Sequence, residues 1–137
     1  MVDGYQYLEV IRKRLAGFQN RTESIPTESE FSIAAVLIPL IIQEGELSVL
    51  FTKRSTHLKH HQGQISFPGG RLELCDRSLV DTALRETNEE IGIKPELIDI
   101  LGSLKPTITP SGYYIFPYIG YLKDLEGLRK NIDEVEK

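Results

Sequence analysis

The stretch FPGGRLELCDRSLVDTALRETNEEIGI, residues 67–93, joins a glycine-rich turn to an amphipathic pattern. Pro68-Gly69-Gly70 interrupts regular structure and lets the backbone approach a neighbouring segment closely. Beyond it, apolar side chains recur at helical spacing, and charged side chains fall largely on the opposite side. Asp76 or Ser78 can cap such a helix at its start, and Gly92 can end it. The pattern therefore predicts a helix with one buried side, made of Leu79, Val80, Ala83, Leu84 and Ile91.

Three glutamates lie on the charged side of this helix. Glu86, Glu89 and Glu90 stand at positions i, i+3 and i+4, so a helix directs their carboxylates toward one point. Like charges held this close destabilise a helix unless a cation lies between them. Mg²⁺ and Mn²⁺ prefer several hard oxygen ligands, so the spacing suits either ion. The alternative is a solvated helix face that serves only solubility.

The run from Gly70 to Ile93 resembles the Nudix box, the sequence pattern of the Nudix hydrolases. Arg85 to Ile93 fits the second half of that pattern closely, with Arg-Glu, two residues, Glu-Glu, one residue and Gly. In the first half, Asp76 stands where the pattern has Glu, and eight residues rather than seven separate it from Arg85. The resemblance implies an enzyme that uses a divalent metal to cleave a pyrophosphate bond.

The resemblance also implies a role for each matched residue. Glu89 and Glu90 would be metal ligands, and Glu86 would be a further ligand or the base that activates water. The carbonyl oxygen of Gly69 would be another metal ligand, and Arg85 would orient Glu86 by an ion pair. Metal ions suit this reaction because they neutralise the crowded phosphate oxygens and lower the pKa of the attacking water.

Upstream residues resemble a second motif, that of the coenzyme A pyrophosphatase branch of the family. The run Leu50-Phe51-Thr52-Lys53-Arg54-Ser55 is followed at matching spacings by Lys59, Gly63 and Phe67-Pro68-Gly69-Gly70. Lys59 replaces an arginine of the motif, which keeps the positive charge but loses the bidentate fork. The resemblance implies cleavage of coenzyme A or acyl-coenzyme A to 3',5'-ADP and 4'-phosphopantetheine or its acyl form. Substrate contacts would come from Arg54, Lys59, Ser66 and Gly70.

Other readings of the same residues remain open. Nucleoside triphosphates, ADP-ribose and NADH all present a pyrophosphate to the same helix, so a Nudix hydrolase of another nucleotide is one alternative. A non-catalytic nucleotide-binding module is a second alternative, because Asp76 and Lys59 depart from the two motifs. In each case the partner is a small nucleotide-like molecule.

The rest of the chain predicts one α/β domain over residues 1–137, built on a mixed α+β sheet covered by helices. The resemblance implies the α/β/α sandwich of the Nudix fold. Pro117, inside an expected strand, suggests that this strand is an edge or carries a bulge. The expected segments are a helix at 4–17, a linker at 20–30, and a Nudix core at 31–137 with strands at 33–42, 47–52, 97–104 and 113–122.

Family members usually continue beyond the region of Asn131 to Val135 with a final strand and a C-terminal helix. The chain ends at Lys137, so the resemblance implies that both elements are lacking and that the domain is truncated or unusually short. Apolar sheet surface would then be bare, and a homodimer is one way to cover it. Glu134, an additional metal ligand or base in this interpretation, would be poorly held.

Composition restricts the partners and the compartment. With 20 acidic and 16 basic residues, the net charge of −4 argues against attachment to nucleic acid or to anionic lipid. No apolar run approaches the roughly 20 residues that span a bilayer, so no membrane segment is expected. The single cysteine, Cys75, cannot form an internal disulfide, and no signal peptide is recognisable, so we expect a cytoplasmic location.

Overall fold

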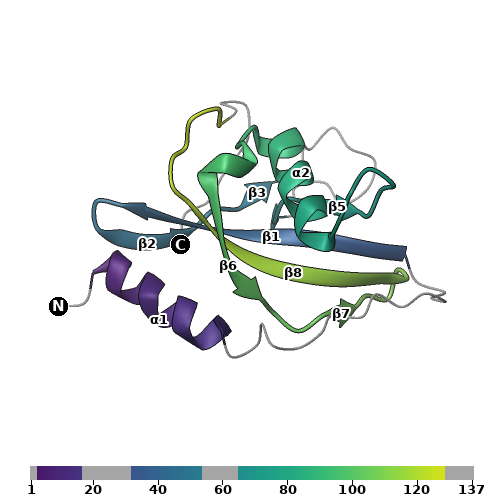
Figure 1. The fold of residues 1–137 in the computed structure, drawn as a ribbon, viewed down its shortest axis with the longest axis horizontal. Coiled ribbons are helices and arrows are strands. Elements are labelled where there is room, and N and C mark those ends of the chain that lie inside the picture. Colours follow the sequence, from purple (N-terminus) through teal and green to yellow (C-terminus); the bar gives the residue numbers. More distant parts are fainter. Residues whose placement is uncertain (1–2, 17–31, 54–64, 129–137) are drawn as a thin grey trace.

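The computed structural model describes residues 3–16, 32–53 and 65–128. These residues form a mixed main sheet, a small two-stranded sheet, and two α-helices on opposite faces of the main sheet (Figure 1). The path through the main sheet is β2-β1-β8-β6, with β5 pairing with β1 and β7 with β8. The elements are α1 Gly4–Ala16, β1 Ser32–Gln43, β2 Glu46–Val49, β3 Thr52–Lys53, β4 Ile65–Ser66, β5 Gly69–Arg71, α2 Leu79–Ile91, the 3-10 helix η1 Pro95–Leu97, β6 Ile98–Ser103, β7 Thr107–Ile108 and β8 Tyr113–Leu122.

β1 is the strand on which the sheet is assembled. One edge runs parallel to β8, while the other pairs with β5 at residues 34–36 and with β2 at residues 40–43. Pro39 lies between these two sections; its carbonyl accepts a hydrogen bond from the Leu50 N–H at 2.9 Å, and its missing N–H leaves that pair at the end of the β2 ladder with a single bond. The predicted β1–β2 hairpin is confirmed, and its turn places Glu44 and Gly45 at φ values of 52° and 79°.

β8 is also an interior strand, parallel to β1 on one side and antiparallel to β6 and β7 on the other. Pro117 therefore does not mark an edge strand, and the register irregularity of the β6–β8 pair lies between Ile100 and Gly102 of β6. It lies between the section paired with β7 at 114–115 and the section paired with β6 at 118–122, and its carbonyl accepts a hydrogen bond from the Leu104 N–H at 2.9 Å. A proline is tolerated here because one partner strand ends where the next begins.

Side-chain alternation along β1 and β8 fills two separate cores. On one face, Leu37 of β1 and Phe116 of β8 pack in the larger core with Ala83 and Ile91 of α2. On the other face, Leu40 of β1 packs against Leu8 and Leu15 of α1 in a smaller core. The unbroken apolar character of β1 follows from this burial on both faces. The sequence prediction of a mixed sheet covered by helices is confirmed.

Two polar contacts tie α1 to the sheet. Its first residue, Gly4, donates a backbone hydrogen bond to the Gly45 carbonyl in the β1–β2 turn at 2.6 Å. Near its middle, Arg12 pairs with Asp99 of β6 at 2.8 Å. Both contacts join segments far apart in sequence, so the helix position depends on the completed sheet.

The remaining sequence expectations divide by whether the structure describes the residues concerned. The helix at 4–17 and the strands at 97–104 and 113–122 correspond to α1, β6 and β8, and the expected strand at 47–52 is divided between β2 and β3. The linker at 20–30 and the segment Asn131–Val135 lie outside the described residues. In the described part of the chain, neither helix has the length and apolarity needed to cross a membrane.

Leu37 provides a test of the two-core arrangement. Its side chain has no exposed surface, so Leu37→Ala should lower the free energy of unfolding by about 3 kcal/mol through lost burial and a residual cavity. Ile108 in β7 is 56 % exposed, so Ile108→Ala should change the free energy of unfolding by less than about 0.5 kcal/mol. Urea unfolding followed by circular dichroism measures both. Equal effects of the two substitutions would contradict the assigned core.

Candidate active site

The helix α2 has well-defined ends. Ser78 is its N-cap, and the Ser78 hydroxyl accepts a hydrogen bond from the Asp81 N–H at 3.1 Å. Gly92 ends the helix in the left-handed region at φ 80°, with its N–H bonded to the Asn88 carbonyl. Of the two N-cap candidates, the structure therefore selects Ser78. The Asp76 carboxylate instead faces the side chain of Arg85 on α2.

Asp76 anchors the guanidinium of Arg85. Arg85 donates from Nε to Asp76 Oδ1 at 2.9 Å and from Nη2 to Asp76 Oδ2 at 3.0 Å, which is a bidentate pair. The Asp76 side chain is only 3 % exposed, and it also accepts from the Glu73 N–H and the Thr82 hydroxyl. Hydrogen bonding to Arg85 holds the pKa of Asp76 well below its usual range, against the opposing effect of burial.

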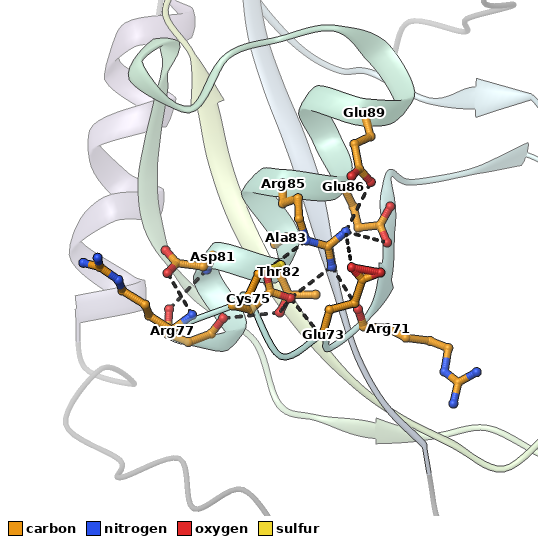
Figure 2. A network of polar contacts seen from close by, with 12 residues as sticks. Arg71, Glu73, Cys75, Arg77, Asp81, Thr82, Ala83, Arg85, Glu86 and Glu89 are labelled. Carbon is orange, nitrogen blue, oxygen red and sulfur yellow. Dashed lines mark hydrogen bonds and ion pairs between the residues drawn. The ribbon is translucent and has the colours of Figure 1, made fainter.

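The third nitrogen of Arg85 faces a group of three glutamates. Its Nη1 lies 3.2 Å from Glu89, 3.4 Å from Glu86 and 3.6 Å from Glu73, while Nη2 also donates to the Arg71 carbonyl at 3.0 Å. Figure 2 shows the guanidinium between the loop that carries Glu73 and the helix that carries Glu86 and Glu89. One cation thus holds together acidic side chains that would otherwise repel one another.

Glu86 is the more enclosed of the two helix glutamates at Arg85. Its side chain is 17 % exposed, compared with 58 % for Glu89. Burial raises the pKa of Glu86; the positive charge of Arg85 opposes this shift, and the negative charge of Glu89 reinforces it. A carboxylate with a raised pKa is a better proton acceptor than an ordinary one, which suits a general base.

Gly69 and Gly70 fit β5 between Glu86 and β1. A Cβ atom on Gly70 would overlap the Glu86 carboxylate, and one on Gly69 would collide with Ala35 and Val36. The Leu37 N–H bonds the Pro68 carbonyl and the Leu72 N–H bonds the Ile33 carbonyl, so alternate residues of β5 face β1. Gly69 belongs to the set that faces away, as does Arg71, whose carbonyl meets Arg85. The Gly69 carbonyl therefore points to the same edge as the acidic group.

Comparison with known proteins assigns this arrangement to a family. The sequence profile of the NUDIX domain matches residues 32–136. This chain belongs to the Nudix family. It is 46 % identical over 109 residues to Nudix hydrolase 3 of Caenorhabditis elegans, a match that covers 77 % of this chain and 45 % of that protein. It is 42 % identical over 102 residues to the uncharacterized Nudix hydrolase NudL of Pectobacterium atrosepticum, a match that covers 74 % of this chain and 53 % of that protein. The chain spans about half the length of these relatives.

Solved Nudix structures share the fold at lower identity. RenU, a Nudix hydrolase from M. smegmatis, superposes with a TM-score of 0.59 at 16 % identity, covering 84 % of this chain and 75 % of its own. An Ap4A hydrolase from C. elegans gives 0.59 at 20 % identity, covering 77 % and 80 %. The NUDIX domain of Shewanella oneidensis NrtR, solved with ADP ribose, gives 0.57 at 20 % identity, covering 84 % and 77 %. These likenesses support the Nudix-type mixed sheet expected from the sequence.

Nudix hydrolases generally use a divalent ion, and the donor chemistry of this site fits one. Two carboxylates from Glu86 and Glu89 and the outward carbonyl of Gly69 are hard oxygen donors on adjacent segments. Within the described residues, no three His, Cys, Asp or Glu side chains are already gathered as a ligand set. Glu86 and Glu89 instead lie against Arg85 Nη1 through their Oε2 atoms.

The structure brings together part of the site predicted from the sequence. Arg85, Glu86 and Glu89 adjoin one another, the Gly69 carbonyl faces their edge, and Gly70 makes room for Glu86. Glu90 is exposed on α2. Ser66 lies in β4, where its hydroxyl is 3.3 Å from that of Thr52. Arg54 and Lys59 lie outside the described residues.

Sequence reasoning missed three residues that shape the site. The sequence pattern offers Asp76 as a departure from the motif or as a helix cap, yet it is the bidentate partner of Arg85. Its position near the start of the motif, where an acidic residue is expected, was the available signal. Thr82 is fully buried and donates to Asp76, and Glu73 reaches Arg85 from the loop.

Asp76→Asn tests the anchoring of Arg85. At pH 7 it should lower the free energy of unfolding by about 3 kcal/mol, because it breaks a largely buried ion pair. The folded-state pKa of Asp76 lies below the unfolded value of about 3.9, so this stabilisation is complete above that pH and is lost as the pH falls through the acid range below it. Urea unfolding at pH 7 and pH 3 should therefore show a smaller difference from wild type at pH 3.

A matched control for this substitution is Asp124→Asn. Asp124 is exposed and accepts only a local backbone hydrogen bond from Glu126 among the described residues, so its substitution should change stability by less than about 0.5 kcal/mol at either pH. An Asp76→Asn variant as stable as wild type at pH 7 would refute the anchoring role.

Proposed function

We propose that this chain hydrolyses the pyrophosphate bond of coenzyme A or an acyl-coenzyme A, with Mg²⁺ or Mn²⁺ bound at Glu86, Glu89, Glu90 and the Gly69 carbonyl. The products would be 3',5'-ADP and 4'-phosphopantetheine or its acyl form. The proposal rests on one observation: Glu86 and Glu89 both lie beside the Arg85 guanidinium, and the Glu86 carboxylate lies against Gly70 of β5.

Each residue has a definable task in this reaction. A bound divalent ion supplies positive charge to the pyrophosphate oxygens and lowers the pKa of water. Glu86 would be a further ligand of this ion or the base that takes a proton from the attacking water, and the missing side chain at Gly70 leaves room for its carboxylate. Glu89 and Glu90, both exposed on α2, would be the other carboxylate ligands of the ion. Rigid placement on a capped helix keeps these groups in position before the substrate arrives.

The proposed substrate rests on the upstream motif and on how its two ends are held. β3 and β4 pair through Thr52 and Ser66, and the Phe51 and Phe67 rings stack beside them with centroids 5.0 Å apart. Because β4 leads directly into β5, the ends of the motif lie near the Gly69 edge. We propose that Arg54 and Lys59, which lie between these ends in the sequence, contact the substrate phosphates, with Ser66 and Gly70 contributing at the edge.

A second candidate is a Nudix hydrolase of another nucleoside diphosphate derivative, such as ADP-ribose, NADH or a nucleoside triphosphate. The observation in its favour is that structures with this fold include an Ap4A hydrolase and a domain solved with ADP ribose. All these molecules share the pyrophosphate group, so α2 does not discriminate among them. Discrimination would depend on the segment that contains Arg54 and Lys59.

Incubation of the purified chain with Mg²⁺ or Mn²⁺ and a substrate panel tests the proposal. The panel contains coenzyme A, acyl-coenzyme A, NADH, ADP-ribose and nucleoside triphosphates, with products identified by mass spectrometry. Coenzyme A should give 3',5'-ADP and 4'-phosphopantetheine with the highest kcat/KM. Preference for another nucleotide would refute the coenzyme A assignment and leave the hydrolase assignment intact. Metal binding with no turnover on any substrate would favour a non-catalytic nucleotide-binding module.

Glu89→Gln is the variant that checks whether the turnover belongs to this site. It keeps the size of the side chain and removes its charge, so kcat should fall by about 10² to 10³-fold with the fold retained. Glu46→Gln makes the same change on exposed β2 and should turn over as wild type does. Wild-type rates in Glu89→Gln would exclude α2 as the catalytic helix.

A further inference from the structure

We propose that Glu73 is a positioning residue of the metal centre: it stays paired with Arg85 while Glu86 and Glu89 turn from the guanidinium to the divalent ion. This inference rests on the proposed function. Glu73 lies outside the residues that the Nudix motif assigns to metal or substrate, and it enters the site from the loop between β5 and α2.

The backbone of Glu73 is fixed by the same carboxylate that anchors Arg85. The Glu73 N–H donates to Asp76 Oδ2 at 2.9 Å, and the Asp76 N–H donates to the Glu73 carbonyl at 3.0 Å. These two bonds close a tight turn, and the Asp76 carboxylate at the end of this turn accepts hydrogen bonds from the guanidinium. Movement of the turn away from Arg85 would therefore break the buried ion pair. Glu73 is held within reach of Arg85 in any state that keeps this pair.

The nitrogens of Arg85 divide between fixed and exchangeable partners. Nε and Nη2 are bound to Asp76 and the Arg71 carbonyl, which are not metal ligands in the proposed mechanism. Nη1 faces Glu73, Glu86 and Glu89 within 3.6 Å. When Glu86 and Glu89 turn to an ion, Nη1 retains Glu73 as its carboxylate partner among these three.

The charge balance gives Glu73 an effect on metal affinity. A guanidinium without a carboxylate at Nη1 would compete with the ion for Glu86 and Glu89 and would repel the ion itself. Glu73 reduces both effects because its negative charge faces the same nitrogen. Its side chain is 58 % exposed, so its pairing with Arg85 adds little to the stability of the metal-free fold. Its contribution appears when the ion binds.

Glu73→Gln tests this role through the dissociation constant of Mn²⁺, measured by electron paramagnetic resonance of the free ion. We expect Mn²⁺ to bind about tenfold more weakly than to wild type, as loss of one nearby charge implies. The control is Glu46→Gln. In the sheet, Glu46 lies opposite Gln43 of β1, and Gly69 of the proposed metal site lies opposite Val36 of β1. Glu46 is therefore roughly 20 Å from Gly69 along β1. The control should bind Mn²⁺ as wild type does.

Two further measurements separate positioning from a structural or ligand role. The melting temperature of the metal-free protein should be the same in wild type and Glu73→Gln; a large decrease would indicate a structural role and overturn the proposal. In the Mg²⁺-loaded protein, the ¹⁵N resonance of the Arg85 Nη1 should shift in Glu73→Gln because that nitrogen loses the carboxylate charge that faces it. Weaker Mn²⁺ binding without that shift would make Glu73 a direct ligand and also overturn it.

The outcomes distinguish this inference from the function on which it rests. If wild type neither binds Mn²⁺ nor hydrolyses any substrate of the panel, the proposed function fails. If wild type binds Mn²⁺ and Glu73→Gln binds it equally well, only the role of Glu73 is refuted.

Discussion

The site depends on one ion pair, the bidentate contact between the Arg85 guanidinium and the nearly buried Asp76 carboxylate. Because Asp76 belongs to the loop after β5 and Arg85 to α2, this contact fixes the helix against the strand. The same guanidinium donates a hydrogen bond to the Arg71 carbonyl and lies within 3.6 Å of three glutamates. Removing either partner would leave a charge with little water around it, so the pair constrains the whole region.

The sheet supplies the second constraint, a narrow space beside Glu86. β5 lies close to β1, and the lack of side chains at Gly69 and Gly70 allows both that approach and the placement of the Glu86 carboxylate. The polar groups of the site therefore lie where a sheet edge meets a helix side, above a well-packed core. In this environment a helix can carry several glutamates on one side, because Arg85 balances part of their charge before an ion arrives.

Local patterns in the sequence predicted what depends on local interactions. The limits of α2, the β1–β2 hairpin and the convergence of Glu86 and Glu89 follow from caps, turn residues and helical spacing. The partner of Arg85, the interior position of Pro117 and the pairing of β5 with β1 depend on contacts between distant segments, which such patterns do not encode. Glu73 was missed for the same reason, since only the folded loop brings it to Arg85.

The central claim is that the edge formed by Gly69, Glu86 and Glu89 binds a divalent metal ion. Anomalous diffraction from crystals soaked in Mn²⁺ tests it most directly, because the signal locates the ion independently of activity. We expect an anomalous peak within coordination distance of the Gly69 carbonyl oxygen and the carboxylates of Glu86 and Glu89, with the Asp76–Arg85 pair intact. A peak elsewhere, or none at this edge under saturating Mn²⁺, would contradict a metal site here.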